Sequence, residues 1–172
     1  MGYTIAICDD DKTMADKLTA SLKNEFMKAG RNDVIIDYYD TGVQLLEALK
    51  NKMYKAVLLD INMEPMDGFA VAEAIGKSGY RTKIIFVTSH EDVVYDTFDY
   101  TPFYFIRKSR YETYVQRVVK KLIAIDGYEK TIVLDDKDGI ININSGDITY
   151  VHSEDHYLTV HTADGNSYVI RK

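Results

Sequence analysis

Apolar residues in the first three quarters of the chain follow two alternating patterns. Short apolar runs predict strands, and longer segments with an apolar residue every three or four positions predict helices. The expected strands cover residues 3–8, 34–39, 56–61, 83–89 and 103–108. The expected helices cover residues 12–29, a segment capped by Thr41, 69–77, the less regular 91–99 and 111–126. Five strand–helix repeats at this spacing predict a doubly wound α/β fold, in which helices cover both faces of a parallel sheet.

The pattern changes after Gly127. Strand-like runs then follow one another without helices, at residues 131–136, 139–144, 147–153, 156–162 and 167–171. Turn-forming residues separate these runs, and Asp164-Gly165 predicts a two-residue hairpin. We therefore place a domain boundary near residues 126–130, with an α/β domain at 1–126 and an all-β segment at 127–172.

Composition changes this picture mainly for the all-β segment. The net charge of the chain is −6, and residues 127–172 contribute −4 of it, because they hold eight acidic and four basic residues. Such a segment is poorly suited to bind the phosphate backbone of DNA by itself. The single cysteine, Cys8, excludes an intramolecular disulfide and lies in an apolar run, which favours a buried core residue. With no membrane-spanning apolar run and no signal peptide, we expect a cytoplasmic protein.

Polar side chains stand at the carboxyl ends of the expected parallel strands. Asp9-Asp10-Asp11 follow the first strand, Asp60 ends the third, Thr88 ends the fourth and Lys108 ends the fifth. Parallel strands end at one edge of the sheet, so we expect a set of five side chains to meet there: Asp9, Asp10, Asp60, Thr88 and Lys108. Three carboxylates in a small volume repel, and Mg²⁺ relieves this repulsion because it prefers oxygen ligands. A hydroxyl and an ammonium beside the metal complete a site suited to phosphoryl transfer, in which Asp60 attacks phosphorus and forms an aspartyl phosphate.

Each of these residues also has a simpler structural explanation. An Asp-Asp pair after a strand can cap a helix, and a threonine or lysine at a strand end is usually structural or solvated. Asp60 is harder to explain in this way, because an unpaired buried carboxylate is costly. The order of the set on successive strands is far more specific than any one member.

Residues 1–126 resemble the receiver domain of bacterial response regulators. The matching motifs are AICDDD, VLLDINMEPMDG, IIFVTSH and FYFIRK. The resemblance implies a flavodoxin-like sheet with strand order 2-1-3-4-5. The roles that it implies are a phosphoacceptor (Asp60), a Mg²⁺ site (Asp9, Asp10, Asp60 and the backbone carbonyl of Asn62), a switch hydroxyl and a switch aromatic residue (Thr88, Phe105) and an invariant lysine (Lys108).

The function implied by this resemblance is that of a two-component response regulator, a phosphoprotein in phosphorelay signal transduction. A sensor histidine kinase would donate a phosphoryl group to Asp60. The receiver would catalyse its own phosphorylation and dephosphorylation, and is not expected to be an enzyme with a separate substrate. Phosphorylation would favour a homodimer through the face formed by the helix at 91–99, the strand at 103–108 and the helix at 111–126. Candidate residues for that face are Tyr95, Phe98 and Tyr100.

Two loops depart from the pattern of the family. Many receivers have proline four residues after the phosphoacceptor, where this chain has Glu64 followed by Pro65. Many also have proline after the lysine, where this chain has Ser109. His90, two residues after Thr88, lies where receivers tune dephosphorylation, although a surface histidine is the simpler explanation. Neither departure removes a group needed for the chemistry.

Residues 130–172 resemble the opening part of a LytTR-type DNA-binding domain. The resemblance is carried by the run of strands and by the stretches DITYV and HYLTVHT. It implies transcription regulation through DNA bound by the complete output domain, of which this chain would hold less than half. His156 matches a loop that reaches DNA in that family.

Two other functions stay open at this stage. The chain could be a receiver-type interaction module whose acidic β segment binds protein and not DNA. It could also be a phosphohydrolase that forms an aspartyl phosphate transiently. Such hydrolases often carry a second aspartate, as general acid, two residues after the nucleophile. Asn62 holds that place here and cannot perform acid–base catalysis at neutral pH.

Overall fold

The computed structural model describes residues 3–79, 81–89, 100–128, 131–136 and 139–171. The chain divides into two compact units, Met1–Lys120 and Lys121–Lys172. The helix expected at 91–99, together with His90, Tyr95 and Phe98, lies outside the described residues.

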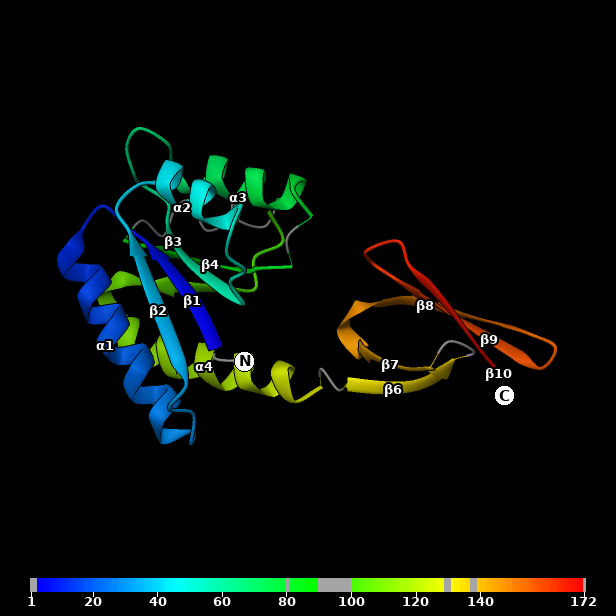
Figure 1. The fold of residues 1–172 in the computed structure, drawn as a ribbon. Helices are drawn as coiled ribbons and strands as arrows, with labels where there is room; N and C mark the ends of the chain where they lie inside the picture. Colours follow the sequence, from blue (N-terminus) through cyan, green and yellow to red (C-terminus); the bar gives the residue numbers. More distant parts are fainter. Residues whose placement is uncertain (1–2, 80, 90–99, 129–130, 137–138, 172) are drawn as a thin grey trace. The chain divides into compact units, whose positions relative to one another are not determined.

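The first unit contains a five-stranded parallel sheet in the order β2-β1-β3-β4-β5 (Figure 1). This confirms the predicted fold class. Its strands are β1 (Tyr3–Cys8), β2 (Val34–Tyr39), β3 (Ala56–Asp60), β4 (Lys83–Thr88) and β5 (Tyr104–Arg107). The described helices are α1 (Lys12–Lys28), α2 (Gly42–Leu49), α3 (Gly68–Lys77), the 3₁₀ turn η3 (Lys108–Arg110) and α4 (Tyr111–Tyr128).

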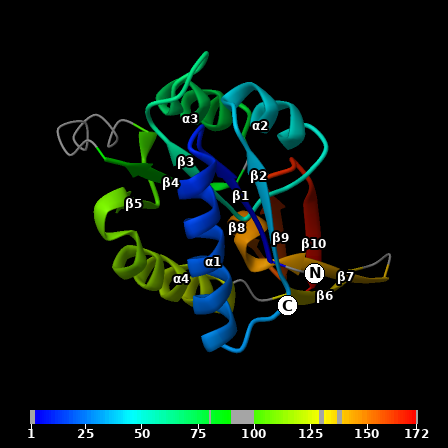
Figure 2. The same ribbon diagram turned by 90° about the vertical axis from the view of Figure 1, so that its left-hand side faces the viewer.

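Helices cover both faces of this sheet, with α2 and α3 on one face and α1 and α4 on the other (Figures 1 and 2). The buried stripe of α1 is the one that its four-residue spacing predicts, and consists of Met14, Leu18, Leu22 and Phe26. The buried residues of α4 recur at helical spacing and include Val115, Val118, Val119 and Leu122. Strand β3 lies at the centre of the sheet and is buried at all five positions, which explains its unbroken apolar sequence up to Asp60.

The second unit is built from antiparallel strands, as the sequence predicted. Strand β6 (Thr131–Asp136) pairs with β7 (Gly139–Asn144). After the 3₁₀ turn η4 (Ser145–Asp147), strands β8 (Ile148–Glu154), β9 (Tyr157–Thr162) and β10 (Ser167–Arg171) form a sheet in the order β10-β9-β8. The core is small, with Leu134, Ile143 and Val160 as its buried side chains.

The hairpin between β9 and β10 differs from the expected two-residue turn. The Thr162 amide donates to the Asn166 carbonyl at 3.0 Å, which leaves a three-residue loop at 163–165. Gly165 closes this loop with a φ of 85°, a backbone conformation typical of glycine in three-residue hairpin loops. The Asp164 carboxylate accepts hydrogen bonds from the Thr162 hydroxyl and from the Asn166 amide. These bonds hold the longer loop, so the two-residue prediction was wrong.

Candidate metal centre

Asp60 occupies the last position of the central strand β3, where its carboxylate is held from two sides. The amide of Ile61 donates to Asp60 Oδ1 at 2.9 Å, and Lys108 Nζ, from the end of β5, donates to Asp60 Oδ2 at 2.9 Å. Asp60 is only 4% exposed. The sheet therefore brings the two residues together although 48 positions separate them in the sequence.

Three carboxylates share this edge of the sheet. One oxygen from each of Asp9, Asp10 and Asp60 lies within 4.8 Å of the others. Lys108 Nζ also contacts Asp9 Oδ2 at 2.9 Å as an ion pair. Apart from this ion pair, the buried oxygen has no hydrogen-bond partner among the described residues. A buried carboxylate oxygen whose one ion-pair partner is shared with a second carboxylate, beside a third, fits a hard divalent cation such as Mg²⁺.

The charges at this edge are coupled. Burial raises the pKa of Asp60, the Lys108 ammonium offsets part of this rise, and the charge of Asp9 adds to it. Burial alone would lower the pKa of Lys108, but its contacts with Asp9 and Asp60 outweigh burial and raise that pKa. Lys108 therefore stays protonated at neutral pH, and a further cation beside Asp60 would favour its ionised form.

The backbone of the acidic pair is tied to neighbouring elements. The Asp9 amide donates to the Tyr39 carbonyl at 3.2 Å, and Asp9 Oδ1 accepts from the Asp11 amide at 2.9 Å. Asp11, the third acidic residue in the run, accepts hydrogen bonds from the amides of Thr13 and Met14. Asp11 is thus the N-cap of α1, the simpler explanation that sequence reasoning had weighed for an acidic run after a strand.

Gly68 is a residue of this site that sequence reasoning missed. Its amide donates to the Ile61 carbonyl at 2.8 Å, at the point where α3 begins. A Cβ atom at Gly68 would lie 2.2 Å from the Asp60 carbonyl oxygen and 2.9 Å from the Ile61 Cα. Only glycine allows α3 to start this close to the strand that carries Asp60. A glycine directly after the helix cap Asp67 is the sequence signal that could have revealed it.

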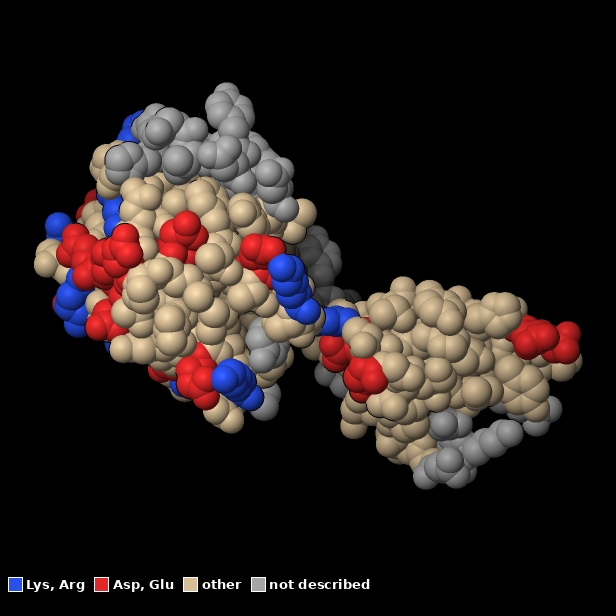
Figure 3. All heavy atoms as spheres, turned by 90° about the horizontal axis from the view of Figure 1, so that it is seen from above, with Lys and Arg blue, Asp and Glu red and all other residues tan. Residues whose placement is uncertain are grey.

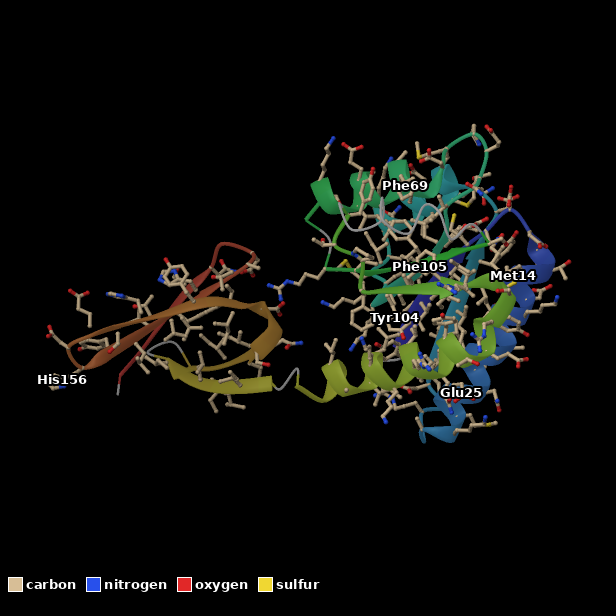
Figure 4. The ribbon with its side chains drawn as sticks, turned by 180° about the vertical axis from the view of Figure 1, so that it is seen from behind. Met14, Glu25, Phe69, Tyr104, Phe105 and His156 are labelled. Carbon is tan, nitrogen blue, oxygen red and sulfur yellow. The ribbon has the colours of Figure 1, made fainter. Side chains whose placement is uncertain are left out.

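The expected switch residues lie in β4 and β5. Thr88 ends β4 and is 1% exposed, and its neighbour Val87 pairs with Asp60 in the sheet. Phe105 in β5 is half-buried and packs against the hydrophobic core (Figure 4). Tyr100, a candidate for a dimer face, is also partly buried and stacks on Phe69, with ring centroids 5.3 Å apart. Packing inside the first unit therefore accounts for Tyr100.

The remaining sequence candidates lie in loops. Asn62 is exposed directly after the site strand, and His156 is exposed in the turn between β8 and β9 (Figure 4). The Glu64–Pro65 peptide bond is cis. Ser109, where many receivers have proline, lies in the 3₁₀ turn η3 that leads directly into α4.

Cys8, at the end of β1, is buried, as predicted, and burial raises the pKa of its thiol to about 12.

Acidic side chains gather on the surface of the first unit in the view of Figure 3, with lysine and arginine side chains between them. Most of the described surface of the second unit in that view carries neither charge. None of the helices in the described part of the chain combines the length and apolarity needed to cross a membrane.

Comparison with known proteins shows which family the first unit belongs to and which solved structures share its fold. Residues 5–120 match the family model of the response regulator receiver domain. The chain therefore belongs to the response regulator receiver family. The receiver-domain structure of MrkE from Klebsiella pneumoniae has a similar fold, with a TM-score of 0.65 at 21% identity over 73% of this chain and 98% of that one. TrrA from Thermotoga maritima, solved in complex with Mg²⁺ and BeF, matches with a TM-score of 0.58 at 28% identity over 71% of this chain and 99% of that one.

Two curated relatives are longer than the matched region. The transcriptional regulatory protein YpdB of Escherichia coli K12 is 28% identical over 52% of this chain, and the match covers 37% of YpdB. The sensory transduction protein LytT of Bacillus subtilis is 23% identical over 96% of this chain, and the match covers 71% of LytT. The similarity to LytT thus spans both the receiver and most of the all-β segment, as the resemblance to LytTR-type regulators implied.

Proposed function

We propose that this chain is the receiver-containing part of a two-component response regulator, in which Asp60 accepts a phosphoryl group from a sensor histidine kinase. One observation carries the proposal. Asp60 is a buried carboxylate at the end of the central strand, 2.9 Å from the Lys108 ammonium and within 4.8 Å of two further carboxylates. Burying a carboxylate costs folding free energy, and a chemical role would explain why this one is present.

The transfer uses residues that stand at the same edge of the sheet. A carboxylate oxygen of Asp60 forms a bond to phosphorus while the P–N bond of the phosphohistidine donor breaks. The imidazole leaves with the bonding electrons and is reprotonated from solvent. Lys108 binds a phosphoryl oxygen, and its position between Asp9 and Asp60 keeps its charge close to the charge that develops in the transition state.

A magnesium ion would be held by Asp9, Asp10 and Asp60, with the Asn62 backbone carbonyl as a further ligand carried over from the receiver family. When bound, Mg²⁺ supplies the positive charge that three neighbouring carboxylates lack. The crystal structure of TrrA with Mg²⁺ and BeF, at 28% identity, supports this choice of metal.

The switch and the output complete the proposal. The new phosphoryl group adds roughly −1.5 to −2 charges, Thr88 donates a hydrogen bond to it, and Phe105 packs further inward.

We assign residues 1–126 to the receiver and residues 127–172 to part of a LytTR-type output domain that regulates transcription through DNA. The match to LytT supports this assignment. Homodimerisation after phosphorylation would place two output domains on paired DNA sites.

The phosphoacceptor is tested with acetyl phosphate and Mg²⁺, and uptake is measured by intact-protein mass spectrometry. We expect Asp60→Asn to abolish uptake, with a loss of at least about 100-fold in rate, because an amide is not a nucleophile. The matched control is Asp40→Asn, which changes an exposed aspartate directly after β2 and should leave uptake unchanged. Chelation of Mg²⁺ with EDTA should stop uptake by the unmodified chain. Uptake by Asp60→Asn at the wild-type rate would disprove this assignment.

A further inference from the structure

Tyr38 connects the neighbouring strand β2 to the metal centre. Its hydroxyl donates a hydrogen bond of 3.0 Å to the backbone carbonyl of Asp9, across 29 positions of sequence. This carbonyl belongs to the peptide group that joins Asp9 to Asp10, the two acidic residues at the end of β1. Because a peptide group is planar, a bond that fixes its carbonyl also fixes the plane from which both side chains depart.

The tyrosine ring is itself held in place. Tyr38 is half-buried, and the Lys12 ammonium at the start of α1 lies 4.9 Å from the centroid of its ring. Lys12 in turn pairs with Asp16. A tyrosine phenol is protonated at neutral pH, so Tyr38 remains a donor.

The bond matters because the Asp9 side chain cannot adjust freely. Asp9 is 1% exposed, its Oδ1 is committed to the Asp11 amide, and its Oδ2 forms an ion pair with Lys108. Asp10 is exposed and has no such enclosure. The direction in which Asp10 offers its carboxylate to a cation therefore depends on the orientation of the peptide group that precedes it.

We propose that Tyr38 is a positioning residue for the metal centre, whose hydroxyl orients the Asp9–Asp10 peptide group so that both carboxylates can bind one divalent cation. This inference rests on the proposed Mg²⁺ site. It adds a residue of β2 that touches neither the metal nor the phosphoryl group. A group that hydrogen-bonds to a metal ligand fixes the orientation of that ligand. Metal affinity falls when such a group is lost, because a misdirected ligand binds weakly.

The adjacent tyrosine supplies a matched control. Tyr39 is also in β2 and also loses only a hydroxyl on change to phenylalanine, but that hydroxyl bonds the Tyr54 hydroxyl at 2.6 Å. The Tyr54 hydroxyl donates to Asp37 in turn, so this second hydroxyl network joins β2 to the segment before β3. Among the described residues, neither hydroxyl of this network bonds Asp9 or Asp10. If Tyr38 only stabilised β2, the two substitutions would behave alike.

The test compares Tyr38→Phe and Tyr39→Phe in the full 172-residue chain. Mg²⁺ affinity is measured by calorimetric titration with MgCl₂, and folding by the thermal midpoint of each variant. We expect Tyr38→Phe to weaken Mg²⁺ binding about tenfold, the lower end of the effect of partners that orient metal ligands, and Tyr39→Phe to leave it within about twofold. The amide resonance of Asp10 should also shift in metal-free Tyr38→Phe and not in Tyr39→Phe, because hydrogen bonding at a carbonyl polarises the N–H of the same peptide group.

The outcomes separate this inference from the function on which it rests. Equal Mg²⁺ affinity in Tyr38→Phe and the unmodified chain would overturn the positioning role and leave the metal site intact. Equal weakening by both substitutions would also overturn it, in favour of a general role in the stability of β2. An unmodified chain that binds no Mg²⁺ would disprove the metal site itself, and the positioning role with it.

Discussion

The two units of this chain use strands in opposite ways. In the first unit, β3 is buried at all five positions, because helices lie on both faces of the sheet. In the second unit, six of the seven positions of β8 are exposed. Large apolar side chains are also exposed there, including Val133, Ile140, Tyr150, Val151, Tyr157 and Val169.

The direction of the strands also decides where functional side chains can come together. Parallel strands all end at one edge, so the first unit brings Asp9, Asp60, Thr88 and Lys108 to that edge from four different strands. Antiparallel strands alternate in direction, and the second unit therefore spreads its strand ends over opposite edges. Asp9 and Asp60 are also buried at this edge, which strengthens the charge interactions between them and Lys108.

The largest expected effect tests the difference in burial directly. Leu58→Ala removes a fully buried side chain from β3 and should lower the free energy of unfolding by about 3 kcal/mol. Ile140→Ala in β7 removes a side chain that is 73% exposed and should cost less than about 0.5 kcal/mol. Urea denaturation, followed by hydrogen exchange of peptides from each unit, measures both losses. Equal losses would show that something covers Ile140 in solution.

The next effect concerns two glycines of α3. Gly68→Ala places a Cβ against the Asp60 backbone and should cost about 2 kcal/mol, together with weaker Mg²⁺ binding. A Cβ atom at Gly76 would meet nothing within 4 Å. Gly76→Ala should therefore raise the free energy of unfolding by about 0.5–1 kcal/mol, because alanine is the better helix former. Thermal unfolding with and without MgCl₂ separates the two. A Gly68→Ala variant of wild-type stability would contradict the close approach.

A smaller effect is confined to the second unit. Gly165→Ala forces a φ of 85° on a residue with a Cβ and should cost about 1.5 kcal/mol. Hydrogen exchange should accelerate in peptides from residues 157–171 and stay unchanged in peptides from 3–89. Faster exchange in both regions would show that the two units unfold together.

The smallest effect follows from the charge of Asp60 in the absence of metal. Burial raises its pKa in the folded protein, so its ionisation opposes folding above the ordinary pKa of an aspartate, and this cost grows until pH passes the folded pKa. Asp60→Asn should therefore stabilise the metal-free chain by about 1 kcal/mol at pH 7 and by nothing at acid pH. Thermal midpoints across this pH range test the prediction, with Asp40→Asn as the exposed control. A destabilised Asp60→Asn variant would mean that its bond with Lys108 outweighs its burial.

Much of the site was predictable because the residues at strand ends follow from the apolar pattern. The runs that end at Asp60, Thr88 and Lys108 identify strands, and parallel pairing then requires their ends to meet. Spacing alone could not distinguish Asp11 from Asp9 and Asp10, because a helix cap and a metal ligand use the same carboxylate, and only the resemblance to receivers separated them. Nor could it predict the three-residue loop closed by Gly165, since a turn signal fixes where a chain reverses and leaves the length of the loop to side-chain hydrogen bonds.

The sequence by itself determined the periodicities of the two regions, the class of the fold and the residue types at the strand ends, because these depend on local spacing. The tertiary structure decided which groups touch. It placed the Gly68 amide against the Ile61 carbonyl, the Lys108 ammonium between two carboxylates and the Tyr38 hydroxyl on the peptide of the acidic pair. The last two of these contacts join residues tens of positions apart, and all three depend on how helices and strands pack in the first unit, which no local pattern contains.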